Sequence, residues 1–187
     1  MAQLIEFEQH ALARLRERLG AAEEANEDLI AFARGHSGAV ATIHEAVLAV
    51  MEAASVDAVL EVVARRWPHI LGIDAAVIAL VVGDRGFLAD SRGVHRVEAA
   101  FVERHIAGRD LVEVRSVERG HPLFGGVART IRAEALIRID SAQPLPQGLL
   151  ALGQRAELDL DSKHGSELLL FLGRAVVATL RRCVATS

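Results

Sequence analysis

The sequence holds 187 residues, 51% hydrophobic and 25% charged, which is enough for one packed core with an appendage and too few for two ordinary domains. Its net charge is −4 and its basic residues form no clustered stripe, which argues against nucleic-acid binding. The longest apolar stretch is far shorter than the ~20 residues of a membrane span, and the acidic N-terminus does not resemble a signal peptide, so we expect a cytoplasmic protein without membrane association.

Residues 3–33 are predicted to form one long helix, because apolar or small residues recur there with heptad spacing. These residues would form the seam of a coiled coil, and a buried Asn26 on that seam would fix the register of two chains. The sequence therefore predicts a homodimer through this helix. The alternative is a single amphipathic helix folded back on its own domain. The predicted dimerisation residues are Ile5, Leu12, Leu15, Leu19, Ala22, Asn26 and Leu29.

A break or kink is predicted at Gly35-His36-Ser37-Gly38, because glycine costs about 1 kcal/mol inside a helix. Heptad spacing continues beyond it at Val40, Ile43, Val47 and Val50, so a second helix is expected over about 39–53. We therefore divide the chain into a helical stalk, residues 1–53, and a domain, residues 54–187.

The domain is predicted to open with a helix that has Ser55 as its N-cap and runs to about Trp67. Pro68 and then Gly72 are expected to end that helix. The following run, residues 75–82, is continuously apolar and rich in Val and Ile, which predicts a central strand.

The remaining elements are predicted from turn residues and apolar spacing. We expect strands over 87–90, 111–117, 133–139 and 148–154, helices over 96–106 and 166–184, and a turn at 124–126. The strands cluster instead of alternating regularly with helices. That order favours an α+β fold with an antiparallel sheet over a doubly wound fold.

Four segments of this part of the chain resemble a known family when their order and spacing are taken together. They are Leu123-Phe124-Gly125, Ala133-Glu134-Ala135-Leu136-Ile137, the strand from Gly148 to Gln154, and the helix start from Gly165 to Gly173. They resemble the GAF-like family catalogued as domain of unknown function number 484, over nearly the whole chain. The resemblance implies a GAF-like antiparallel sheet flanked by helices, with a long N-terminal coiled-coil helix and no established activity.

Several positions depart from the pattern of that family. Gln154 stands where a Ser is usual, Ala156 where an Asp is common, and Ser166 and Glu167 replace Thr and Asp. If the replaced Asp serves a ligand in relatives, the ligand site of this chain is altered or lost.

Catalytic and metal-binding patterns are weak in this sequence. The eight His residues are scattered without ligand spacing, and neither a nucleophile elbow nor a phosphate loop is present. Cys183 is the single cysteine, so no internal disulfide can form. We therefore predict no enzymatic activity, no cofactor and no metal site.

A ligand pocket is predicted between the sheet and the helices that cover it. Charged residues expected near that face could together hold a carboxylate or phosphate: Arg115, His121, Arg138 and Arg155. The alternative is that these are ordinary solvated strand ends. Asp74 and Asp140, also at strand ends, are expected to compete as partners of the arginines.

Three functions remain open from the sequence. The leading hypothesis is a non-catalytic, homodimeric regulatory or scaffold module in which a ligand or an unknown partner protein shifts the packing of two domains. The second is a small-molecule sensor with a pocket for an anionic ligand. The third is an enzyme of unrecognised type, which would need a deep pocket with convergent titratable groups.

Overall fold

The computed structural model describes Gly20 and residues 38–140, 146–156 and 163–185. The chain divides into two compact units, Met1–Ala41 and Thr42–Ser187. In the first unit, the described residues 20 and 38–41 are helical. The predicted dimerisation residues lie outside the described residues, so self-association through them stays a prediction. The boundary between the units falls earlier in the chain than the expected boundary after residue 53.

The second unit begins with a helix that ends at Met51, and its residues 42–51 are termed the leading helix below. Ile43, Val47 and Val50, which continue the heptad spacing of the stalk, are buried in the core of this unit. In this part of the chain, the apolar spacing therefore serves the domain's own packing.

Three short helical segments follow without interruption: α2 (Val56–Glu61), the π-helical turn η1 (Val62–Arg66) and α3 (Trp67–Leu71). Ser55 is the N-cap as predicted, since its Oγ accepts the backbone N–H of Ala58 at 3.2 Å. The prediction that Pro68 ends the helix is wrong. Pro68 lies in the first turn of α3, where a backbone N–H is not needed, and the helix ends at Gly72, which has a φ of 64°.

The sheet has six strands, all pairing antiparallel, in the order β3-β2-β1-β6-β5-β4. The strands are β1 (Ala75–Val82), β2 (Arg85–Asp90), β3 (Gly93–Glu98), β4 (Val112–Ser116), β5 (Ala133–Ile139) and β6 (Gln147–Gln154). This arrangement confirms the predicted α+β class with an antiparallel sheet.

Two elements differ from the predictions. The expected helix over 96–106 begins only at α4 (Ala99–Ile106), because residues 93–98 form the edge strand β3. Most of β3 is exposed, so it lacks the alternation of apolar and polar residues that marks a half-buried strand. The predicted turn at 124–126 is part of a longer 3₁₀ segment, η2 (Pro122–Thr130), which bends at Gly125.

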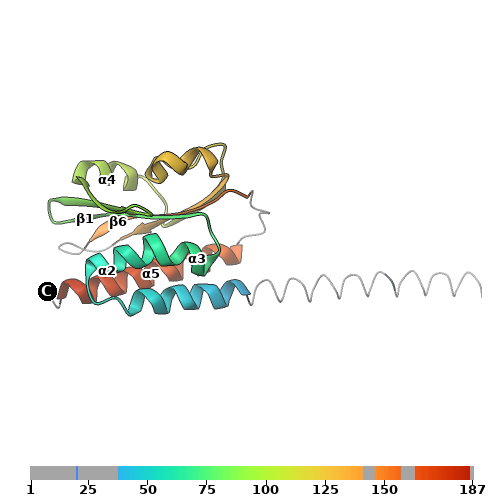
Figure 1. Cartoon of the computed structure of the whole chain (residues 1–187), viewed down its shortest axis with the longest axis horizontal. Helices are drawn as coiled ribbons and strands as arrows, with labels where there is room; N and C mark the ends of the chain where they lie inside the picture. Colours follow the sequence, from blue (N-terminus) through green and yellow to red (C-terminus); the bar gives the residue numbers. More distant parts are fainter. Residues whose placement is uncertain (1–19, 21–37, 141–145, 157–162, 186–187) are drawn as a thin grey trace, which may run out of the picture. The chain divides into compact units, whose positions relative to one another are not determined.

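Each face of the sheet has its own cover (Figure 1). The face termed the helix face packs against the leading helix, α2, η1, α3 and α5 (Lys163–Ala185). The opposite face, termed the loop face, packs against α4 and η2. On the helix face, α5 approaches β5 so closely that a Cβ at Gly173 would lie 2.5 Å from Cγ2 of Ile137. A side chain at that position would push the helix away from the sheet.

Long-range hydrogen bonds hold the helical layer together. The indole N–H of the fully buried Trp67 donates to the carbonyl of Ala46 at 3.0 Å. Near the end of α5, the guanidinium of Arg182 donates to the carbonyls of Met51 and Ala53 at 2.7 and 2.6 Å. These carbonyls lie at the end of the leading helix, where helix carbonyls lack intrahelical partners. Arg182 therefore caps one helix from another.

Candidate functional site

A buried carboxylate joins two of the four predicted ligand residues. Arg115 of β4 lies directly opposite Glu134 of β5 in the strand register. Its Nε and Nη2 donate to Oε1 of Glu134 at 2.8 and 2.7 Å, while the backbone N–H of His121 donates to Oε2 at 2.6 Å. The side chain of Glu134 is 0% exposed, and both of its oxygens are occupied. This cluster ties the start of η2 to the sheet.

The imidazole of His121 is buried beside that carboxylate and is neutral at pH 7. Its Nδ1 accepts the backbone N–H of Leu123 at 3.3 Å, so the neutral ring carries its proton on Nε2. Among the described residues, Nε2 has no hydrogen-bond partner. Burial, followed by the nearby Arg109, His105 and Arg115, lowers the pKa of His121 from 6.5 to about 4.

Two edge-to-face ring contacts connect His121 to α4. The ring of His105 lies edge-on to the His121 ring at 4.8 Å between centroids, and the ring of Phe101 lies 4.7 Å from that of His105. Burial, followed by Arg109 and Arg104, also lowers the pKa of His105. Several cationic groups thus disfavour a positive charge on this pair of rings, which makes the pair a poor site for a metal cation.

The other two predicted residues lie elsewhere and have acidic partners. Arg138, near the end of β5, donates to Oδ2 of Asp140 at 2.9 Å and to the carbonyl of Arg109 at 2.8 Å. Arg155 follows β6, and its backbone N–H donates to Oδ2 of Asp74 at 2.8 Å. The structure therefore brings Arg115 and His121 together around Glu134 and leaves Arg138 and Arg155 apart. The four do not converge on one anion site.

The space between the sheet and the loop-face cover is filled by apolar side chains. The ring of Phe124 lies over Gly153 of β6, where a Cβ would be 2.8 Å from its Cζ. Two segments of the family resemblance, the Leu-Phe-Gly turn and the strand from Gly148, therefore meet in space. The buried side chains of this layer are Val77, Ala79, Val102, Leu123, Phe124, Ala128, Ile131, Leu136, Leu149 and Ala151.

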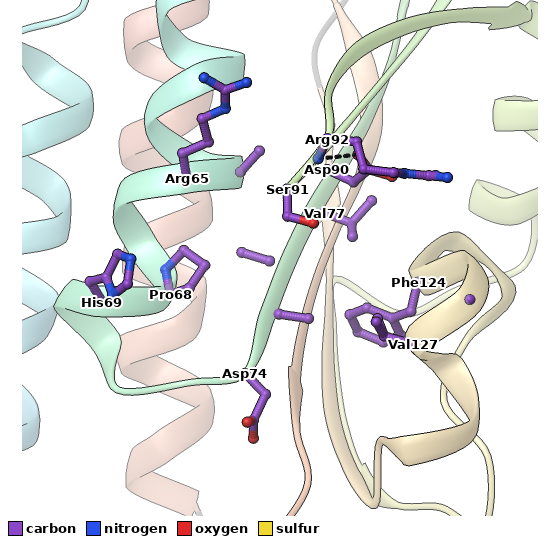
Figure 2. Close-up of a pocket in the computed structure, with 14 residues that line it drawn as sticks. Arg65, Pro68, His69, Asp74, Val77, Asp90, Ser91, Arg92, Phe124 and Val127 are labelled. Carbon is purple, nitrogen blue, oxygen red and sulfur yellow. Dashed lines mark hydrogen bonds and ion pairs between the residues drawn. The ribbon is translucent and has the colours of Figure 1, made fainter.

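A groove of about 510 Å³ opens at the start of β1, between the helical layer and η2 (Figure 2). Pro68 and His69 of α3 lie on one side of it, and Phe124 and Val127 of η2 on the other. Figure 2 shows Asp74 at one end and the turn of Ser91 and Arg92 at the other. The groove has mixed polar and apolar walls, as small-molecule sites commonly do.

The charged groups of this groove are paired or point apart. Asp90 accepts Nη2 and Nε of Arg92 at 2.6 and 3.0 Å. Burial raises the pKa of Asp90, but the hydrogen bonds from the side chain and backbone of Arg92 outweigh that effect and hold it below its usual value. In Figure 2, Arg65 and Arg92 extend in different directions. The groove thus has room for a ligand without a convergent set of polar groups.

Sequence reasoning missed Glu134, which organises the only two predicted ligand residues that meet. A signal was available, because Glu134 is the one acidic residue in the predicted strand over 133–139, and apolar residues stand on both sides of it. A carboxylate at such a position needs a buried cation or several N–H donors. The sequence does not reveal which donors, because they come from β4 and from the start of η2.

The described residues show neither a metal cluster nor a membrane span. No group of three or more His, Cys, Asp or Glu residues is arranged to hold a metal ion there. Within the same part of the chain, none of the helices has the length and apolarity needed to cross a bilayer.

Comparison with known proteins places the chain in a family and a fold. The family model described as "Protein of unknown function, DUF484" matches residues 1–185. No curated protein matches the sequence. Many chains of solved structures also match this chain.

Three of these structures illustrate the likeness. Free methionine-R-sulfoxide reductase from Neisseria meningitidis, in complex with its substrate, is 15% identical with a TM-score of 0.57, covering 78% of this chain and 90% of that one. The A. aeolicus nlh2 GAF domain in an inactive state is 12% identical with a TM-score of 0.54, covering 78% and 97%. The GAF domain of Acinetobacter phosphoenolpyruvate-protein phosphotransferase is 12% identical with a TM-score of 0.50, covering 78% and 94%. At these identities the likeness establishes a GAF-like fold and nothing about activity.

Proposed function

Since this chain belongs to the DUF484 family and has a GAF-like fold, we propose that it is a non-catalytic regulatory or scaffold module that acts as a homodimer. Its N-terminal helix would pair two copies, and a ligand or partner protein would alter how their domains pack. The module is proposed to work in the cytoplasm.

The observation that carries this proposal is the filled loop face. Apolar side chains occupy the space between the sheet and its cover of α4 and η2, so this layer leaves no room for a catalytic pocket. The charged residues expected there are used in structural contacts, with Glu134 fully enclosed between Arg115 and the backbone of His121. An enzyme of unrecognised type would need an open site with convergent titratable groups.

The free methionine-R-sulfoxide reductase has a similar fold, but at 15% identity this similarity does not imply that the present chain has reductase activity. Thiol-based redox chemistry requires an accessible thiolate. The single cysteine of this chain, Cys183, is 1% exposed and packs in the helical layer against the carbonyl of Ala53. Its burial supports a structural role in α5.

The second candidate, a small-molecule sensor, is favoured by one observation. The 510 Å³ groove beside β1 lies within the usual size range of small-molecule sites. If a ligand bound between α3 and η2, it would contact both covers of the sheet and so could change their relative packing.

Self-association of the full-length chain tests the leading proposal. Sedimentation equilibrium at micromolar concentration is expected to give the mass of a dimer. Replacing Leu12 and Leu19 together by Glu should give a monomer, because both leucines lie on the predicted seam.

The matched control replaces Ala13 and Ala21 together by Glu, which adds the same charge at positions predicted to face away from the seam. This variant should remain dimeric. A monomeric parent chain would remove the proposed dimer, and equal dissociation of both double variants would remove the predicted seam.

A further inference from the structure

A second groove lies on the helix face of the sheet, opposite the filled layer under α4 and η2. It has a volume of about 290 Å³ and runs between α5 and the ends of β4 and β5. It is termed the β4–α5 groove below. Its lining residues are Leu111, Ile137, Arg138, Asp140, Leu170, Gly173, Arg174, Val177, Ala178 and Arg181.

The base of this groove is apolar. Gly173 brings α5 into contact with Ile137, which closes the space between helix and strand at that point. Leu170 and Val177 of α5 are half-buried beside it, and Leu111, just before β4, is 46% exposed. Exposed apolar surface next to a concavity favours an apolar ligand group there.

The rim of the β4–α5 groove is positively charged, although the whole chain has a net charge of −4. It carries three arginines and one carboxylate, that of Asp140, which is paired with Arg138. Arg174 and Arg181 are exposed, and within the described part of the chain neither has an ion pair or hydrogen bond. They lie seven residues apart on α5, about 10 Å along one helix face.

Arg138 lines the same groove through its place on β5, but the alternation of that strand directs its guanidinium toward the loop face, where Glu134 and Leu136 also lie. Its two terminal nitrogens are held by the carbonyl of Arg109 and by Asp140. Its Nε is buried and has no partner among the described residues. Arg138 was also one of the ligand residues predicted from the sequence.

We propose that the β4–α5 groove binds a small amphipathic organic anion. The aliphatic or aromatic body of the ligand lies against Leu111, Leu170 and Val177, and its carboxylate is held by Arg174 and Arg181. The volume is close to the lower end of the range for small-molecule sites, so the ligand is smaller than a dinucleotide. This inference rests on the proposed regulatory function in one respect, because it gives that module a ligand. It does not depend on the predicted dimer seam, which is not part of the groove.

Calorimetric titration of the full-length protein with octanoate tests the site. Acetate supplies the head group alone, and octylammonium supplies the same chain with the opposite charge. We expect sub-millimolar binding of octanoate and at least tenfold weaker binding of the other two. Equal binding of acetate would show that the apolar base contributes nothing, and equal binding of octylammonium would show that the arginines contribute nothing; either result overturns the proposal. Absence of octanoate binding overturns it directly.

Variants of the groove separate charge from shape. Arg174→Gln with Arg181→Gln should weaken octanoate binding about tenfold or more, because charge-assisted hydrogen bonds are lost. Ala178→Trp, at an exposed position on α5, should block the groove without changing charge. The control is Arg96→Gln with Arg119→Gln, which removes the same charge from exposed positions outside the groove and should leave binding unchanged.

Sedimentation of the same samples keeps this test distinct from that of the dimer. A dimer that binds no octanoate overturns the groove ligand alone. A monomer that binds octanoate, with affinity lost in the Arg174 and Arg181 double variant, overturns the dimer proposal and supports the groove. Retention of full affinity in that double variant, or equal loss in the control, overturns the groove.

Discussion

The two faces of the sheet are closed by different chemistry. The helix face is sealed by apolar packing around Trp67, and its long-range hydrogen bonds run from Trp67 and Arg182 to backbone carbonyls. The loop face has an apolar layer as well, but a buried Glu134 and a neutral, buried His121 hold its edge. The helix face should therefore depend mainly on shape, whereas closure of the loop face should also depend on protonation and on charge pairing.

Trp67→Ala should produce the largest effect, because it empties the centre of the helix face. The side chain is 0% exposed, and its loss also leaves the carbonyl of Ala46 without the indole donor. We expect the free energy of unfolding to fall by about 3–5 kcal/mol in urea titrations. Phe171→Ala, on the exposed surface of α5, is the control and should cost less than about 1 kcal/mol. Equal losses would mean that Trp67 is not central to this face.

Glu134→Ala tests the charged edge of the loop face. It leaves the backbone N–H of His121 without its buried acceptor and Arg115 without a partner. Because Arg115 is half-exposed and can recover hydration, we expect a loss of about 2–3 kcal/mol, which is less than for Trp67.

Glu113→Ala is the matched control for that change. Glu113 also pairs with an arginine, Arg109, but its side chain keeps 23% exposure and receives no backbone donor from the described residues. We expect a loss of about 1 kcal/mol or less. If the two substitutions lower the free energy of unfolding equally, burial of the Glu134 carboxylate does not determine how much the loop-face edge contributes to stability.

The central strands of the sheet were predictable from the sequence, and the edge elements were not. The strand at 75–82 was predicted with its observed bounds, because an unbroken apolar run is what a strand buried on both faces requires. The edge strand β3 pairs through its backbone and exposes most of its side chains, so no side-chain pattern marks it. The segment η2 was also missed, since its bend at Gly125 depends on packing over the sheet.

The candidate site was less accessible to sequence reasoning than the fold. Asp74 and Asp140 were anticipated as partners of the arginines, because each lies close to a strand end where an arginine was also expected. The pairing of Arg115 with Glu134 could not be anticipated, since it depends on the register between β4 and β5. Which polar residues meet across a sheet is decided by long-range pairing, and single-sequence periodicity gives only the face.

The last prediction concerns the pH dependence of stability. His121 takes up a proton near pH 6.5 when unfolded and only near pH 4 when folded. Between these values the unfolded state binds more protons, so acidification from pH 6.5 toward 4 lowers the free energy of unfolding. His105, whose folded pKa is also lowered, acts in the same direction. Urea titrations at a series of pH values should show this decline in the parent chain.

His121→Asn isolates the contribution of that one ring. An Asn side chain can still accept the N–H of Leu123 as a helix cap, and the backbone N–H at position 121 can still reach Glu134, so the variant should fold. Its stability should decline less between pH 6.5 and 4 than that of the parent, with the difference largest near pH 4. If the two declines are parallel, His121 is not the group that makes the loop face sensitive to acid. The contrast between the two faces would then rest on Glu134 and its partners, because the apolar helix face has no comparable buried acid or imidazole among its described core residues.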